Sequence, residues 1–244
     1  MKTNRVSKGF SLIELMVAMA AGLVVIGAVV VFTISTARST STNVRSTRVM
    51  QNLRGSLNVI EREIRRSGFD ERALKYANAC SDPTVPASCP TSNFSQLVVV
   101  NPSCVVVLYD NAANTTPGTI VAGEYHAFRR TTKSGVGVIQ ASLASATLPD
   151  CTVAATDAAW QDLSDPNVVD ITALSFADTF TPTAQGGGCA KAASGLWVVV
   201  QDVQVAVTGQ WVDPSSHVTT TRSLEESVRV KNDRVSTTKP SVCS

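Results

Sequence analysis

A run of twenty uncharged residues near the N-terminus, residues 15–34, limits what this chain can fold into. An α-helix rises about 1.5 Å per residue, so the run would be about 30 Å long, which matches one bilayer hydrocarbon core. A secretory signal has a shorter apolar region followed by a small-residue cleavage site. Ala18, Ala20 and Ala21 resemble such a site, but the apolar run continues well past them. The sequence therefore predicts a retained membrane helix.

A single carboxylate, Glu14, directly precedes this run. A charged side chain at the bilayer centre costs about 2.5–3.5 kcal/mol on insertion scales, so an acid inside a membrane helix is a candidate functional residue. The alternative is an acid at the membrane interface, where the helix dipole stabilises a negative charge near the helix N-terminus. The position alone leaves both interpretations open.

The residues around Glu14 form a motif, Lys8-Gly9-Phe10-Ser11-Leu12-Ile13-Glu14-Leu15. This octapeptide resembles the processing site of type IV prepilins and of type II secretion pseudopilins. The resemblance implies that a prepilin peptidase in the membrane cuts after Gly9 and methylates the new amine of Phe10. It also implies that Glu14, the fifth residue of the mature chain, docks subunits by neutralising the amine of a neighbour. Opposite charges attract strongly at low dielectric, which supports that role.

The segment before the cleavage point is basic and contains Lys2, Arg5 and Lys8. These charges would hold an uncut N-terminus at the cytoplasmic face, so cleavage would switch the chain from membrane storage to extraction into a filament. The sequence departs from the family pattern at Val31, where many major pilins carry a proline. Melting of the helix during assembly would therefore have to use Gly22 and Gly27.

The segment after residue 34 turns polar but keeps a helical pattern. Apolar residues recur at spacings of 3, 4, 3 and 4: Met50, Leu53, Leu57, Ile60 and Ile64. Such a stripe predicts an amphipathic helix that packs on the rest of the chain. Gly68 is a typical helix stop, so we expect one helix from residue 11 to residue 67.

The polar side of this helix carries four arginines: Arg54, Arg62, Arg65 and Arg66. They form either a solvated helix face or a surface that pairs with acidic groups of neighbouring subunits. Residues 50–54 together with the helix end at residues 60–69 also resemble the PilW branch of minor pilins, and J-type pseudopilins share a similar helix end. The C-terminal stretch 224–232 resembles the last strand of PilW-like proteins, although Lys231-Asn232 stands where those usually carry Arg-Asn.

Beyond residue 82, turn residues alternate with strand-like runs at residues 96–100, 104–109, 124–131, 136–141, 168–176, 196–207 and 222–230. Residues 203–207 alternate valine with other residues, so one face of that strand is expected to be buried. The glycine-rich stretch 179–193 is expected to be a flexible loop.

The expected fold is α+β and pilin-like. A long N-terminal helix, first membrane-spanning and then amphipathic, packs against an antiparallel β-sheet head. The expected parts are a prepilin leader at 1–9, a membrane half-helix at 10–34, an amphipathic half-helix at 35–69 and a β-rich head at 70–244.

Six cysteines, all beyond residue 79, are disulfide candidates: Cys80, Cys89, Cys104, Cys151, Cys189 and Cys243. Their absence from the N-terminal third fits a distal part that is oxidised outside the cytoplasm. The alternative is a set of reduced, buried thiols. Six cysteines allow fifteen pairing schemes, and a Cys80–Cys89 bridge would be the most local bridge among them. A Cys189–Cys243 bridge would pin the C-terminus, as a disulfide does in major pilins.

The chain shows no residue set typical of an enzyme, so we expect it to be an enzyme's substrate and not an enzyme. Its two histidines, His126 and His217, stand in no metal or hydrolase motif, and neither a cofactor nor a metal is expected. A calcium loop is the open alternative, built from Asp162, Asp165 and Asp170. Without the leader, 18 basic side chains stand against 19 acidic ones, so no nucleic-acid partner is expected.

These features together predict a minor type IV pilin that primes pilus assembly at or near the pilus tip. The alternatives are a J-type pseudopilin of a type II secretion system, or a pilus component that binds DNA or an adhesin. The expected partners are prepilin peptidase, other minor pilins, the major pilin, the inner-membrane assembly platform, membrane lipid and a tip adhesin. The chain would be a single-pass inner-membrane protein before assembly, and would lie in the periplasm and the surface fibre afterwards.

Overall fold

The computed structural model of this chain describes residues 9–71, 94, 97–111, 119–145, 147–179, 189–191, 197–212, 218–232 and 234–236. These residues form one α-helix and eleven β-strands. The chain divides into two compact units, Met1–Thr47 and Arg48–Ser244, which are described separately below.

The helix α1 runs over Leu12–Arg66, within one residue of the predicted bounds at each end. It ends where Gly68 adopts a φ of 77°, the left-handed conformation that glycine adopts without steric cost. The backbone N–H of Gly68 then donates to Leu108 O at 2.9 Å, which ties the helix end to the head. The predicted glycine stop is therefore confirmed.

The first unit contains the N-terminal part of α1. Its large apolar side chains are exposed, and the helix is long and apolar enough to cross a membrane. A threonine-rich stretch begins near the end of the apolar run, and its hydroxyls donate to carbonyls one turn earlier. The donors are Thr33, Thr36, Thr40, Thr42 and Thr47, at 2.8–3.2 Å.

The second unit contains three antiparallel sheets. The five-stranded sheet consists of β1 (Leu97–Asn101), β2 (Cys104–Leu108), β3 (Tyr125–Lys133), β4 (Val136–Ser145) and β5 (Gln161–Asp162), paired in that order. One three-stranded sheet has the order β10 (Thr219–Arg229), β9 (Asp202–Val212) and β6 (Asp170–Thr179). The other has the order β11 (Arg234–Ser236), β8 (Trp197–Val199) and β7 (Cys189–Lys191).

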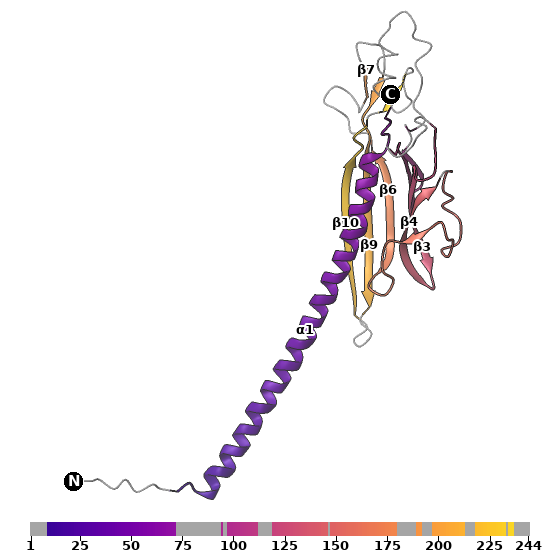
Figure 1. Cartoon of the computed structure of the whole chain (residues 1–244). Helices are drawn as coiled ribbons and strands as arrows, with labels where there is room; N and C mark the ends of the chain where they lie inside the picture. The colour runs from indigo at the N-terminus through magenta and orange to yellow at the C-terminus, as the bar shows by residue number, and fades with distance from the viewer. Residues whose placement is uncertain are drawn as a thin grey trace, which may run out of the picture. The chain divides into compact units, whose positions relative to one another are not determined.

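The hydrophobic core lies where the C-terminal half of α1 packs over the β10–β9–β6 sheet and the inner face of the β1–β5 sheet (Figure 1). The predicted stripe is buried at Leu53, Leu57, Ile60 and Ile64, but Met50 is only half-buried. Val49, four residues before Leu53, takes the buried position because the spacing of 4 continues the stripe. On β9 the buried residues alternate as predicted, at Val203, Val205 and Val207. The expected α+β fold is confirmed.

Two strand predictions were wrong. The run 196–207 forms two strands, β8 and β9, because the chain leaves one sheet after Val199 and enters another at Asp202. The stretch 179–193, expected to be a loop, contains β7, and its remaining residues after 179 lie outside those described. The two- and three-residue strands β5, β7 and β11 are too short to show a sequence alternation.

Two glycines of the second unit should respond oppositely to the same substitution. A Cβ at Gly137 in β4 would lie 2.0 Å from Ile171 O of β6, whereas a Cβ at Gly55 on α1 meets nothing within 4 Å. We expect Gly137→Ala to lower the free energy of unfolding by about 2 kcal/mol through overpacking. Gly55→Ala should raise it by about 1 kcal/mol through helix propensity.

Denaturant titration of the full chain in detergent would measure both effects. Similar midpoints for the two variants would contradict the close approach of β4 to β6.

Candidate functional site

The predicted processing site lies at the start of α1. Gly9 and Phe10 are exposed and precede the helix, and Phe10 is 91% exposed. Ser11 is the N-cap, because its carbonyl accepts the first helical hydrogen bond, from Leu15 N at 3.2 Å. The Gly9–Phe10 peptide bond therefore lies in exposed, non-helical chain, which is the kind of backbone that a protease can bind.

Glu14 turns back toward the cleavage point. Its Oε2 accepts a hydrogen bond from the backbone N–H of Ser11 at 3.0 Å. This is half of a capping box, in which an acid three residues after the N-cap satisfies the N-cap amide. Cleavage after Gly9 would leave the new amine on Phe10, one residue from the amide that Glu14 already binds. The structure thus places the predicted carboxylate beside the predicted amine, while the roles of Gly9, Phe10 and Glu14 stay predictions.

The apolar surface of α1 that follows has no protein cover. Every residue from 15 to 34 except Gly22 is exposed. Such a continuous apolar surface requires a nonpolar medium or a partner. Its length and composition fit a single membrane crossing.

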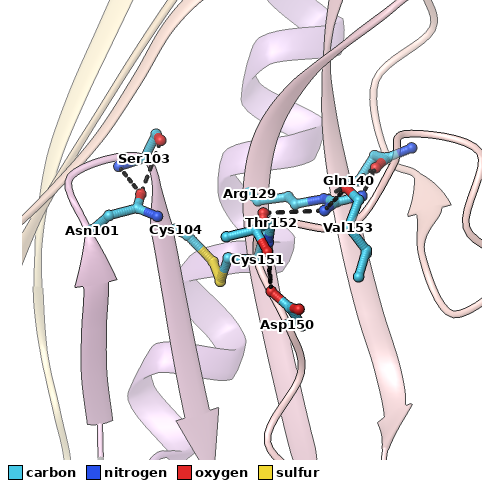
Figure 2. The surroundings of a disulfide bond; sticks show 9 residues. All are labelled: Asn101, Ser103, Cys104, Arg129, Gln140, Asp150, Cys151, Thr152 and Val153. Carbon is cyan, nitrogen blue, oxygen red and sulfur yellow. Dashed lines mark hydrogen bonds between the residues drawn. A yellow bond between two sulfur atoms is a disulfide. The ribbon is translucent and has the colours of Figure 1, made fainter.

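The head contains a disulfide that joins Cys104 of β2 to Cys151, which lies in the segment between β4 and β5 (Figure 2). Reduced thiols, the alternative left open by the sequence, are therefore wrong for this pair. Neither of the two suggested pairings included it. Three further candidates lie outside the described residues: Cys80, Cys89 and Cys243. Cys189 begins β7, and its suggested partner lies outside the described residues, so both suggested bridges stay predictions.

A buried arginine that the sequence did not single out lies beside this disulfide. Arg129 of β3 is 2% exposed and stands opposite Cys104 in the β2–β3 register. Its Nη1 donates to Cys151 O at 3.1 Å and to Val153 O at 2.7 Å (Figure 2). Burial lowers the pKa of the Arg129 guanidinium.

The remaining donors of Arg129 are also used. Nη2 donates to Ala154 O at 3.0 Å, and both Nε and Nη2 donate to Gln140 Oε1. The guanidinium lies over the Trp160 ring, 4.1 Å from its centroid. Disulfide and arginine together hold the 150–160 segment against the outer face of the β1–β5 sheet.

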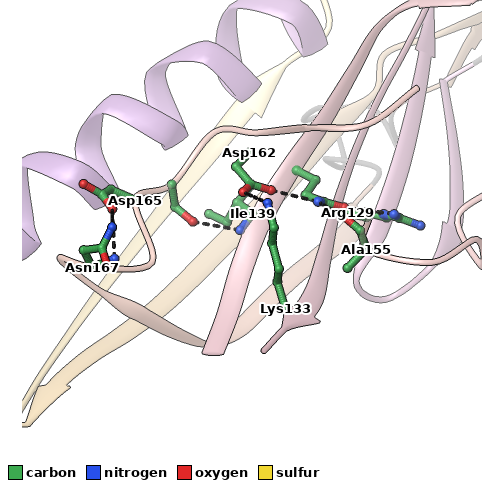
Figure 3. Close-up of polar contacts among 9 residues, drawn as sticks. Arg129, Lys133, Ile139, Ala155, Asp162, Asp165 and Asn167 are labelled. Atoms are coloured by element: carbon green, nitrogen blue, oxygen red, sulfur yellow. Dashed lines mark hydrogen bonds and ion pairs between the residues drawn. The ribbon is translucent and has the colours of Figure 1, made fainter. Parts of the chain in front are cut away.

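The three aspartates of the suggested calcium loop have separate hydrogen-bonding partners. Asp162 Oδ2 accepts from Lys133 Nζ at 2.6 Å, and Asp165 Oδ1 accepts from the backbone N–H of Asn167 at 2.8 Å (Figure 3). Asp170 Oδ1 accepts from Gly137 N at 2.8 Å. Within the described part of the chain, no three His, Cys, Asp or Glu side chains are grouped so as to hold a metal ion.

Two protein-family models match the chain. The prokaryotic N-terminal methylation motif matches residues 4–30, which contain Gly9, Phe10 and Glu14. The family described as prepilin peptidase-dependent protein B matches residues 42–230, more than half of the chain. Searches of curated proteins and of solved structures found no significant match.

The two matches cover both units and agree with the structure. The methylation motif covers the cleavage point and the apolar helix, and the family match covers the helix C-terminal half with most of the head. They support a minor pilin but do not distinguish the PilW branch, which stays a prediction. The chain belongs to the prepilin peptidase-dependent protein B family, and it is a membrane-anchored minor type IV pilin that prepilin peptidase processes.

Proposed function

We propose that this minor pilin is cut after Gly9, methylated at Phe10, and then helps to prime pilus assembly just below the pilus tip. The observation that carries the proposal is the placement of Glu14 at the N-terminal end of an uncovered apolar helix, beside the cleavage point. A subunit that keeps this acid can dock against a neighbour's amine. The tip subunit of related systems often lacks the acid, which supports a position below the tip.

The chemistry of docking follows from the first turn of α1. A carboxylate accepts several hydrogen bonds, so Glu14 can keep the Ser11 N–H on Oε2 and offer Oε1 to an incoming amine. The capping bond also fixes the carboxylate at a set position along the helix. An ion pair formed there, at low dielectric, would set the axial register between neighbouring helices.

The proposed function also implies where the chain lies in the cell and which partners it has. The chain would cross the inner membrane once, with its leader in the cytoplasm and its head in the periplasm. The Cys104–Cys151 bond supports an oxidising compartment for the head. Other minor pilins, the major pilin and the assembly platform would be its partners, and the head would present a tip adhesin. In this pathway the chain acts as a substrate and a building block, not as an enzyme.

A J-type pseudopilin is the second candidate, because the processing motif and a helix ending of this kind occur in both classes. Gene neighbours separate the two. Other minor pilin genes would favour a pilus, and secretin and secretion ATPase genes would favour a secretion system.

Deleting the gene should reduce surface piliation and twitching, and normal piliation and twitching would refute the priming role.

Intact mass spectrometry of the membrane-extracted protein tests the processing directly. We expect a mass that lacks residues 1–9, carries one added methyl group, and lacks the two hydrogens of the Cys104–Cys151 bond. A Gly9→Val variant serves as the control, because a bulky residue before the cut should leave the leader attached. A native polypeptide that still begins with Met1 would overturn the proposal.

A further inference from the structure

Four residues form a polar cluster where the last turns of α1 meet the β1–β5 sheet: the buried Glu63, Tyr109 and His126, and the exposed Arg66, whose Nη1 lies 3.8 Å from Glu63 Oε2. We refer to them as the Glu63 cluster. Glu63 is 6% exposed, although it belongs to a helix segment rich in charge. Tyr109, the residue after β2, donates its hydroxyl to Glu63 Oε2 at 2.6 Å. His126 of β3 stacks on Tyr109 with ring centroids 4.6 Å apart, and the Arg66 guanidinium lies 4.3 Å from the same ring centroid.

The hydrogen bonds fix the protonation of the imidazole. His126 Nε2 lies 2.9 Å from Gly123 O, and a carbonyl can only accept, so Nε2 carries the proton. In the neutral ring Nδ1 then has a free lone pair. Nδ1 is buried, has no hydrogen-bond partner among the described residues, and lies 3.9 Å from Glu63 Oε2. A negative oxygen and an unprotonated nitrogen therefore face each other inside the protein.

The charges around this contact compete. Burial lowers the pKa of His126, the Glu63 carboxylate opposes that effect, and the Arg66 guanidinium adds to it. Arg62 also faces the cluster, with its Nε 3.5 Å from Glu63 Oε1. Burial raises the pKa of Tyr109, as does its bond to Glu63, so this hydroxyl stays protonated and donates. The imidazole is the member of the cluster whose ordinary pKa lies nearest to neutral pH, and burial lowers that pKa.

We propose that His126 is a proton-operated latch between α1 and the β1–β5 sheet. In the neutral form, Glu63 is held by Tyr109, and the helix end stays docked. A proton on Nδ1 creates an imidazolium that is buried away from water and repelled by Arg66, and its attraction to Glu63 offsets only part of that cost. Acidification outside the inner membrane would therefore loosen the attachment of the assembly helix to the head, without any change at Glu14.

The sign of the effect follows from linkage. A histidine whose pKa is lowered by folding binds a proton more readily in the unfolded chain. Its contribution to stability is complete above the ordinary pKa of about 6.5 and is lost as the pH falls toward the lowered folded value. The head should therefore be less stable at pH 5 than at pH 7.5.

The chain provides a matched control, because His126 and His217 are its only histidines. Thermal unfolding of the full chain in detergent would be measured from pH 8 to pH 5. Between pH 7.5 and pH 5, we expect the Tm of the native chain to fall further than the Tm of His126→Gln. The difference between the two falls should be about 3 °C for each pH unit by which folding lowers the pKa of His126. Glutamine keeps an N–H for Gly123 O and cannot take up a proton. His217→Gln should follow the native profile.

A second measurement does not depend on a stable variant. In the native chain labelled at histidine, the NMR titration of His126 should have its midpoint below that of the unfolded chain, and Glu63→Gln should lower it further. A His126 midpoint at or above the unfolded value would overturn the latch. Parallel pH profiles for His126→Gln and the native chain would also overturn it.

Discussion

Replacing Glu14 with Ala should reduce incorporation of this minor pilin into sheared pilus fractions by about a hundredfold. The reason is that a neighbour's N-terminal amine would remain buried without a counter-charge. Removing one partner of a buried ion pair costs about 3–5 kcal/mol, and each 1.4 kcal/mol is a factor of ten in an equilibrium. The amount in the membrane and the removal of residues 1–9 should stay unchanged. Quantitative immunoblots of pilus and membrane fractions would measure the ratio.

Glu14→Gln separates the charge from the helix cap. Glutamine also completes a capping box, so it can accept the Ser11 N–H that Glu14 Oε2 binds at 3.0 Å. If the charge matters, Glu14→Gln should fail as Glu14→Ala does. Rescue by glutamine would mean that the residue acts only as a cap. Glu61→Ala removes another acid of α1, outside the apolar run, and should incorporate normally.

Replacing both Cys104 and Cys151 with Ala should lower the free energy of unfolding by about 4 kcal/mol. The disulfide joins residues 47 apart, and chain-entropy arguments assign about this value to a loop of that length. Denaturant midpoints of the native chain and the double variant, both under oxidising conditions, would measure the change. Equal midpoints would show that the bond is not formed in the native protein.

The contacts of Arg129 identify the segment that should open first when the Cys104–Cys151 disulfide is removed. The Arg129 guanidinium binds the carbonyls of Cys151, Val153 and Ala154, and Gln140 Nε2 donates to Ala155 O at 2.7 Å. Without the disulfide, the 150–160 segment loses its covalent attachment to the sheet and keeps only these noncovalent contacts. Limited proteolysis of the double variant should therefore cut this segment before any other described part of the head. A first cut elsewhere in the described head would contradict the role of the disulfide in holding the 150–160 segment on the sheet.

The helix and the core strand were predictable because their patterns are local. A spacing of 3 and 4 identified the face that Leu53, Leu57 and Ile60 bury, and Gly68 marked the end. The alternation on β9 likewise depends only on neighbouring residues. The motif around Gly9 is equally local, and the family match agrees with it.

The polar interior was not predictable in the same way. Glu63 is bonded to Tyr109, 46 residues away, and its burial follows from a contact that no local period encodes. The one available signal was its position, three residues after Ile60 on the buried side of the helix. The pairing of Cys104 with Cys151 depends on how the segment after β4 folds back over β2, whereas sequence spacing favoured the more local Cys80–Cys89 bridge.

The threonine stretch of α1 has a consequence for how the helix fits bilayers of different thickness. Because the hydroxyls of Thr33 and Thr36 already donate to Val29 O and Phe32 O, these residues can enter lipid without an unpaired donor. The hydrophobic length of the helix can therefore adjust to the thickness of the bilayer. The helix can move about one turn deeper into the bilayer, until Arg38 reaches the headgroups, at little cost in free energy. A subunit whose membrane-spanning length can change in this way can stay inserted while the membrane around an assembling fibre thins or thickens.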